Sequence, residues 1–255
     1  ILDHTNINLQ IQKALFNKYF LVIFDNQQKK SFMADVLINA NPNVSRLDLK
    51  KRIKNKNITL LLGNKYSVIK LPNKGLKNRK FDTVFFCFGG GNDKNVLFNF
   101  LKFIKKKNLS TSFDINLIIG PMNENYQKYK KYIKNNNIKN VNIFFNPKNI
   151  YEIMKRCFFA VISPGTLFYE LSYFKKPTYL IYLNKKQKNL ALSWSKGNLI
   201  TGFQSFKSYD FKKIVENIYL FKNKKKKFID KKLNYGDNSK KIILKINKMH
   251  RSSNE

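Results

Sequence analysis

From residue 81 onward, short apolar runs alternate with longer stretches in which apolar residues recur every three or four positions. The short runs are rich in Val, Ile, Phe and Tyr, as strands buried on both faces of a sheet are. They predict strands at Thr83–Phe88, Ile115–Ile119, Val141–Phe145, Phe159–Ile162 and Thr178–Tyr182. The stretches between them predict helices at Asn95–Lys107, Asn125–Asn135, Ile150–Lys155, Leu167–Lys175 and Gln187–Lys196. This alternation is typical of an α/β domain with a parallel sheet.

The chain before residue 81 carries fewer elements, with strands predicted at Phe20–Phe24, Val36–Asn39 and Leu60–Leu62. Residues 71–80, which include Pro72 and Gly75, are typical of a linker. The chain opens on Ile1 inside an apolar run. We therefore expect residues 1–70 to be the C-terminal remnant of a first domain whose beginning is missing, and 81–255 to form a complete second domain. Two further helices are predicted at the C-terminal end, at Phe211–Phe221 and Lys240–Lys248.

A net charge of +35 and a pI near 10.1 first point to a polyanionic partner. Lysine, however, accompanies an equally heavy use of Asn, Ile, Phe and Tyr, and the chain has only five arginines, the residue favoured for bidentate phosphate recognition. We expect no specific nucleic acid partner, and we expect the run Lys222–Lys227 to be a solvated surface segment. Binding of any polyanion through the lysines stays open as the weakest alternative.

Cysteine and histidine give no support for a metal site or a disulfide scaffold. Cys87 and Cys157 lie in apolar runs far apart in the sequence, which favours a reducing compartment. His4 and His250 share no ligand spacing with either cysteine. No signal peptide or long apolar segment is present, so we expect a cytoplasmic protein that does not insert into a membrane and needs no cofactor.

Four groups of chemically distinctive residues follow predicted strands of the second domain. They are Gly89, Gly90 and Gly91 with Lys94 and Asn95; Gly120; Gly165 and Thr166 with Glu170; and Gln187. Parallel sheets place ligands at the carboxyl ends of their strands, and all four groups would share that edge. Glycines admit a phosphate close to the backbone, helix N-termini offer free N–H groups, and a carboxylate accepts hydrogen bonds from a ribose diol.

Each group also has a purely structural interpretation. The glycine run and Gly120 could be tight turns without a ligand, and Thr166 with Glu170 could simply start a helix. Gln187 lies in an Asn-rich region where amides are common. His4 could contact a sugar from the end of a strand, although a lone histidine there is more often structural.

With these residues in place, the chain resembles the nucleotide-sugar hydrolases of pseudaminic acid biosynthesis, which are relatives of the GT-B glycosyltransferases. The resemblance runs from Asp3 to about Gly236. The matching segments are Ile1 to His4, Phe24-Asp25, Ala34 to Asn39, Leu62 to Tyr66, Gly89-Gly90 with Lys94-Asn95, Ser163 to Glu170, Lys176-Pro177, Gln187 and Gly197.

The resemblance implies two Rossmann-type domains, the first incomplete here and the second binding UDP. It implies hydrolysis of a UDP-linked diacetamido-trideoxy sugar to UDP and the free sugar, without metal or organic cofactor. Residues 89–95, Gly165 and Thr166 would line the diphosphate site, Glu170 would hold the ribose, and Gln187 would reach the diphosphate or the sugar.

The chain departs from the family pattern on the sugar side. The family's Gly-His loop would precede Ile1, its tyrosine after the Asp-His pair is Thr5, its second paired aspartate is Asn26, and an Asn is replaced by Lys186. Two alternatives therefore stay open: a glycosyltransferase that uses a UDP-sugar donor, and a degenerate protein that binds a nucleotide sugar without catalysis.

Overall fold

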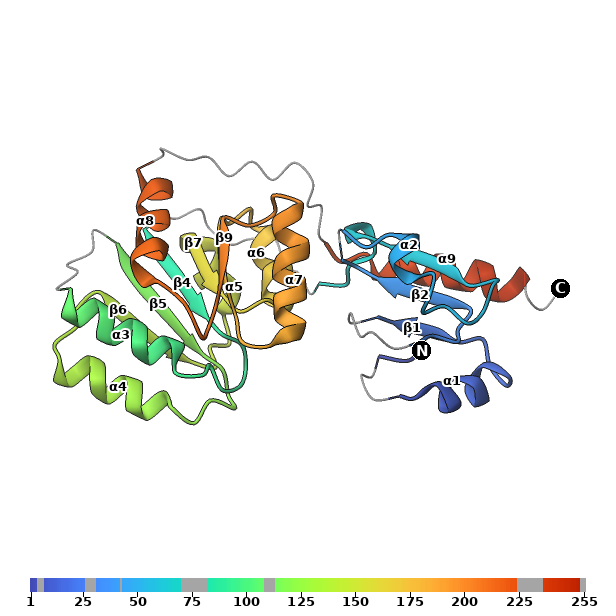
Figure 1. The fold of residues 1–255 in the computed structure, drawn as a ribbon, viewed down its shortest axis with the longest axis horizontal. Coiled ribbons are helices and arrows are strands. Elements are labelled where there is room, and N and C mark those ends of the chain that lie inside the picture. The colour runs from blue at the N-terminus through green and yellow to red at the C-terminus, as the bar shows by residue number, and fades with distance from the viewer. Residues whose placement is uncertain are drawn as a thin grey trace. The chain divides into compact units, whose positions relative to one another are not determined.

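The computed structural model describes residues 1–3, 7–25, 31–41, 43–69, 82–107, 113–223 and 236–252. The chain divides into two compact units (Figure 1). Unit 1 combines Ile1–Leu71 with Leu233–Glu255, and unit 2 is Pro72–Lys232. The predicted linker at 71–80 lies outside the described residues.

Unit 1 is built on a parallel sheet with the order β1-β2-β3. The strands are β1 (Val22–Phe24), β2 (Val36–Asn39) and β3 (Thr59–Leu62). Leu2 adds a parallel bridge to Ile23, next to β1. Helices α1 (Leu9–Phe16) and α2 (Arg46–Leu49) supply apolar side chains to the core on one face of this sheet. A short 3₁₀ turn, η1 (Asn64–Tyr66), follows β3.

The last helix, α9 (Ser239–Ser252), belongs to unit 1 although it ends the chain. Ile242, Ile246 and Met249 lie on one helical face and pack on the second face of the sheet formed by β1, β2 and β3. The Lys245 Nζ atom donates a 2.9 Å hydrogen bond to the Tyr66 hydroxyl. The expectation that residues 81–255 form one domain therefore fails for α9. An amphipathic pattern shows that a helix needs a partner, but it does not say which sheet supplies it.

Unit 2 contains six parallel strands in the order β6-β5-β4-β7-β8-β9. Their bounds are β4 (Thr83–Cys87), β5 (Asp114–Ile119), β6 (Val141–Phe145), β7 (Cys157–Ile162), β8 (Thr178–Tyr182) and β9 (Gly202–Ser205). The five strands predicted in this region are confirmed to within two residues. The edge strand β9 was not predicted, because its sequence Gly-Phe-Gln-Ser is only half-buried and lacks an apolar run.

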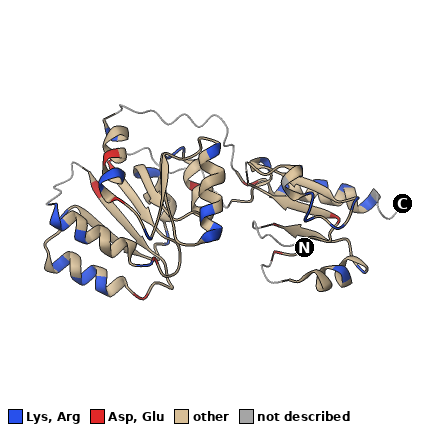
Figure 2. Cartoon of the chain, in the orientation of Figure 1, with Lys and Arg blue, Asp and Glu red and all other residues tan. Residues whose placement is uncertain are grey.

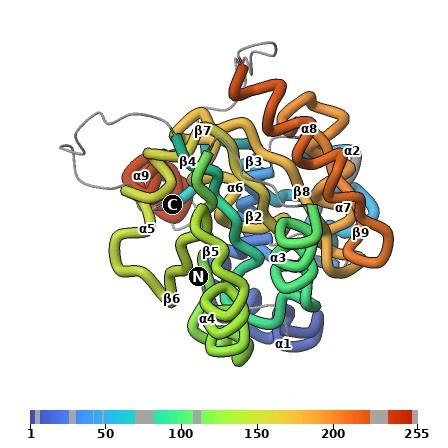
Figure 3. Tube along the Cα trace, turned by 90° about the vertical axis from the view of Figure 1, so that its left-hand side faces the viewer, coloured from blue at the N-terminus to red at the C-terminus, as the bar shows by residue number. Residues whose placement is uncertain are grey.

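Helices cover both faces of the unit 2 sheet, and Figure 3 shows α3 and α5 on opposite sides of β4 and β5. Helices α3 (Val96–Lys106), α4 (Tyr126–Asn135) and α8 (Phe211–Lys222) share one core with alternate strand residues such as Val84 and Phe86. The other helices are α5 (Ile150–Arg156), α6 (Thr166–Tyr173) and α7 (Lys185–Lys196). Their buried side chains include Phe168 and Trp194, whose rings stack with centroids 3.9 Å apart. Because helices cover both faces of the sheet, the side chains on both faces of its central strands are buried, and these strands are continuous apolar runs in the sequence.

Candidate functional site

The strand order of unit 2 reverses between β4 and β7. From β4 the chain proceeds outward to β5 and β6, and it then returns to β7 on the other side of β4. In open parallel sheets such a switch point leaves a crevice at the carboxyl ends of the two strands. The Ser163 amide donates a 3.2 Å hydrogen bond to the Cys87 carbonyl at this end. The structure therefore brings together the loops that start at Gly89 and at Ser163.

The glycine loop after β4 also touches the turn after β5. A Cβ atom on Gly120 would collide with the backbone of Gly89 and Gly90, so only glycine fits there. The Met122 amide donates a 2.8 Å hydrogen bond to the Gly90 carbonyl, which fixes the two loops against each other. Gly89 itself has φ +87°, a conformation that favours glycine. Three of the four predicted groups thus meet at one edge of the sheet.

The N-terminus of α3 differs from the sequence-based expectation, which assigned it free N–H groups. The buried Asp93 carboxylate accepts hydrogen bonds from the amides of Asn95 and Leu97, each at 3.2 Å. This carboxylate already neutralises the positive end of the helix dipole. Lys94 and Asn95 are exposed and have φ values of 55° and 61°. Helix α3 is therefore capped by its own chain.

The N-terminus of α6 lacks a side-chain cap. Gly165 is its N-cap residue, and no side chain there accepts a hydrogen bond from the helix. Thr166 is the first helical residue and is exposed, so it starts the helix without occupying the N-cap position. In the described part of the chain, the amides of Thr166 and Leu167 donate no hydrogen bond. Together with Gly90 and Gly91, whose amides are equally free there, they can receive an anion.

Glu170 lies one turn further along α6 and close to the same crevice. Burial raises the pKa of its carboxyl group. The pKa of the Cys87 thiol is raised to about 11, mainly by burial and in smaller part by the negative charge of Glu170. The same two causes raise the pKa of Tyr151. Glu170 is thus near Cys87, at the end of β4.

Gln187 has a structural role that explains its position. Its Oε1 atom accepts a 2.7 Å hydrogen bond from the Leu183 amide, and its own amide donates to Asn184 Oδ1 at 2.9 Å. This pair resembles a capping box at the start of α7, with Gln187 reaching the amide of the residue before the N-cap Asn184. Among the described residues, no hydrogen bond joins Gln187 to the glycine loop. Its predicted contact with a ligand stays a prediction.

The predicted catalytic residue, His4, lies outside the described residues, as do Thr5 and Asn26. Sequence reasoning missed a buried polar cluster in unit 1. The Asp25 carboxylate, at the end of β1, forms a 3.3 Å ion pair with Arg52 and accepts a 2.9 Å hydrogen bond from Asn39. The pairing of a buried carboxylate with a strand-end amide is invisible in sequence because the three residues are far apart in the chain.

Within the described ranges, no three His, Cys, Asp or Glu side chains are grouped so that they could hold a metal ion. In that same part of the chain, no helix is long and apolar enough to cross a membrane. Figure 2 shows Lys and Arg spread over helices of both units.

No known protein-family model matches the chain. In a comparison with curated proteins, the chain is 29% identical over 182 residues to the uncharacterized protein MJ1062 of Methanocaldococcus jannaschii. That match covers 66% of this chain and 36% of the relative, so the chain spans about a third of the relative's length.

Solved structures give a clearer comparison. MurG of Acinetobacter baumannii matches with a TM-score of 0.54 and 10% identity, covering 86% of this chain and 61% of MurG. The glycotransferase of kitacinnamycin matches with a TM-score of 0.50 and 11% identity, covering 74% of this chain and 46% of that enzyme. The chain has the GT-B fold. The two Rossmann-like sheets, of three and six parallel strands, are its two halves, and the predicted fold class is confirmed.

Proposed function

We propose that unit 2 binds the UDP moiety of a nucleotide sugar, and that the whole protein hydrolyses this sugar as in the pseudaminic acid pathway. Water would attack the anomeric carbon, the bond from that carbon to the β-phosphate oxygen would break, and UDP would leave. The observation that carries the proposal is the convergence of three strand-end loops on the free N-terminus of α6, with Glu170 beside them.

The roles follow from the chemistry of each group. The free amides of Gly90, Gly91, Thr166 and Leu167 would bind the diphosphate oxygens, because backbone N–H groups and a helix dipole favour negative charge. Lys94 is exposed on the glycine loop and would add a positive charge. Glu170 would accept hydrogen bonds from the ribose hydroxyls. Water attack also needs a general base, for which His4 is the sequence-based candidate.

Calorimetric titration with UDP tests the nucleotide site directly. We expect saturable binding to this chain, much weaker binding of CMP, and about ten- to a hundredfold weaker UDP binding by Glu170→Gln, since one charged acceptor is lost. Glu216→Gln, on an exposed position of α8, is the matched control and should bind like the wild type. Equal binding of UDP and CMP would reduce the site to a nonspecific attraction by lysines.

A glycosyltransferase is the second candidate, favoured by the shared fold with the glycotransferase of kitacinnamycin. The two functions differ in what accepts the sugar. A hydrolase releases UDP from a UDP-sugar in water alone, whereas a transferase requires an added acceptor. The assay uses the longest natural form of the protein with UDP-linked diacetamido-trideoxy sugars. Release of UDP only after an acceptor is added would overturn the hydrolase proposal in favour of a transferase. Binding of the UDP-sugar without any release of UDP would indicate a binding protein without catalysis.

A further inference from the structure

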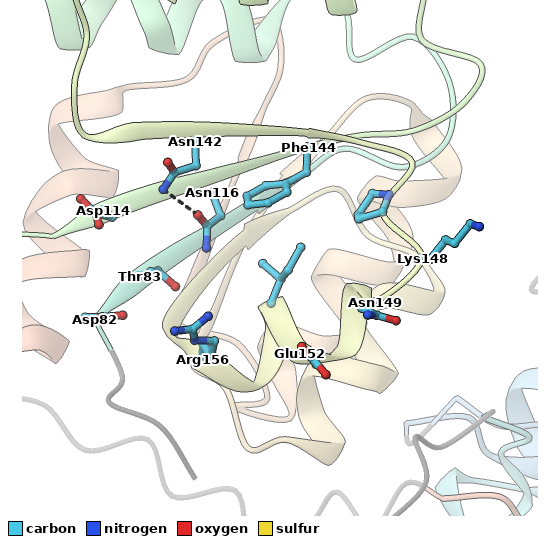
Figure 4. A pocket seen from close by; sticks show the side chains of 12 residues that line it. Asp82, Thr83, Asp114, Asn116, Asn142, Phe144, Lys148, Asn149, Glu152 and Arg156 are labelled. Carbon is cyan, nitrogen blue, oxygen red and sulfur yellow. Dashed lines mark hydrogen bonds between the residues drawn. The ribbon is translucent and has the colours of Figure 1, made fainter. Parts of the chain in front are cut away.

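A pocket of about 640 Å³ opens in unit 2 near the beginnings of β4 and β5, away from the glycine loops at the ends of these strands. Figure 4 shows side chains from the strands on one side and from α5 on the other. The lining residues are Asp82, Thr83, Asp114, Asn116, Asn142, Phe144, Pro147, Lys148, Asn149, Glu152, Ile153 and Arg156. A volume of this size is typical of small-molecule sites.

Two asparagines form the strand side of the pocket. Asn116 and Asn142 are register partners on β5 and β6, and Asn142 Nδ2 donates a 3.2 Å hydrogen bond to Asn116 Oδ1. Asn116 is only 6% exposed, and its amide nitrogen points away from Asn142 into the pocket (Figure 4). In the described part of the chain this nitrogen donates no hydrogen bond. This amide nitrogen can donate to a ligand or to water that reaches the pocket.

Thr83 provides a second unsatisfied group. Its hydroxyl oxygen is buried and has no hydrogen-bond partner among the described residues. Thr83 starts β4, next to β5, so its hydroxyl and the Asn116 amide are offered by neighbouring strands of one pocket. A hydroxyl both donates and accepts, so the pair matches a ligand that itself carries hydroxyl or amide groups.

The charges around the pocket favour a neutral ligand. Three carboxylates, Asp82, Asp114 and Glu152, face two cations, Lys148 and Arg156. None of these five side chains forms an ion pair with another described residue. The chain as a whole carries +35, so this nearly balanced set stands apart from its surroundings. Such a site gives no electrostatic advantage to a phosphate or another anion.

Phe144 and Ile153 add an apolar surface to this ring of polar groups. A sugar ring has the matching chemistry, because its C–H face packs on an aromatic ring while its hydroxyls bond amides, carboxylates and guanidinium groups. We propose that this pocket is a second carbohydrate site, which holds a neutral or N-acetylated sugar ring, free or within a glycan. The site does not share residues with the nucleotide site, so it does not depend on the proposed UDP chemistry.

Titration of the isotope-labelled chain with N-acetylglucosamine, followed by NMR, tests the proposal. We expect saturable shifts of the Asn116 side-chain amide and of the Thr83 backbone amide that persist in excess UDP. Asn142→Ala, at an exposed position, should weaken binding about three- to tenfold by releasing the Asn116 amide from its orientation. Asn116→Leu, which removes the donor itself, is the second variant, and its folded state is checked by the same spectra.

Asn135→Ala, an exposed position at the end of α4, is the matched control and should leave the affinity unchanged. The proposal is overturned by shifts that never saturate, by equal affinity in all variants, or by displacement of the sugar by UDP. It is also overturned if acetate produces the same shifts at the same concentration, since the pocket would then take small anions.

Discussion

The Tyr129 hydroxyl donates a 2.8 Å hydrogen bond to the Oδ1 atom of Asp93, and both residues are almost completely buried. Tyr129 lies in α4 and Asp93 in the loop before α3, so the bond ties the segment after β5 to the segment after β4. Asn123, in the turn after Gly120, accepts a 2.9 Å hydrogen bond at its Oδ1 atom from the Asn125 amide, just before α4. The glycine loop is thus braced by buried hydrogen bonds of Asp93 and Tyr129, which sequence alone did not reveal.

Tyr129→Phe should lower the free energy of unfolding by about 1–3 kcal/mol, because it leaves the buried Asp93 carboxylate without one of its donors. UDP affinity should fall as well, since the glycine loop loses a support. Urea denaturation and calorimetry measure the two effects. Tyr132→Phe on the same helix is the control, because its hydroxyl has no partner among the described residues. Equal stability of the two variants would contradict the bracing role.

Gly120→Ala should destabilise unit 2 and weaken UDP binding together. The added methyl group meets the backbone of Gly89 and Gly90, which cannot yield like a flexible side chain. Overpacking of this kind costs about 1–3 kcal/mol, measurable as a lower urea midpoint. Gly91→Ala should keep its stability, because nothing lies within 4 Å of its added Cβ. A Gly120→Ala protein as stable as Gly91→Ala would show that the loops can separate.

Glu170→Gln should raise the melting temperature at neutral pH but not below the ordinary carboxyl pKa of 4.5. Burial raises the folded-state pKa of Glu170, so the folded protein holds this proton more tightly than the unfolded chain does. Stability is therefore lost as pH rises from 4.5 through the raised value, and glutamine removes that loss.

Thermal unfolding measured across this pH range checks the sign of the Glu170 effect. Glu124→Gln, at an exposed position after β5, should change the melting temperature little at any pH. A Glu170→Gln protein that is less stable than the wild type at neutral pH would mean that the carboxylate is held by a cation or donors in the folded state.

Two substitutions at Gln187 separate its cap from its predicted ligand contact. Gln187→Ala should destabilise the fold by about 0.5–2 kcal/mol, since the Leu183 amide loses its acceptor. Gln187→Glu keeps an acceptor and should keep the stability. If the side chain also faces the diphosphate, Gln187→Glu weakens UDP binding by charge repulsion, as calorimetry would record. Unchanged UDP affinity in a stable Gln187→Glu protein would show that Gln187 caps α7 and does not contact the diphosphate.

The central strands of unit 2 were predictable because each is a continuous apolar run. The predicted strand Phe159–Ile162 lies within β7, and Thr178–Tyr182 coincides with β8. Helix α1 and strand β9 were not predicted, since one is a short helix with few buried side chains and the other a half-buried edge strand. A fully buried strand shows a clear local apolar pattern, whereas these two elements bury too few side chains to show one.

The sequence by itself determined the α/β class, the parallel sheet of unit 2 and the glycine-rich ends of its strands, because periodicity and residue type are local properties. Only the tertiary structure decided that Asp93 closes the N-terminus of α3 while that of α6 stays free, and that α9 returns to unit 1. Capping and helix docking depend on which distant segments meet in space. These contacts between distant segments result from tertiary packing, so a local sequence pattern does not show them.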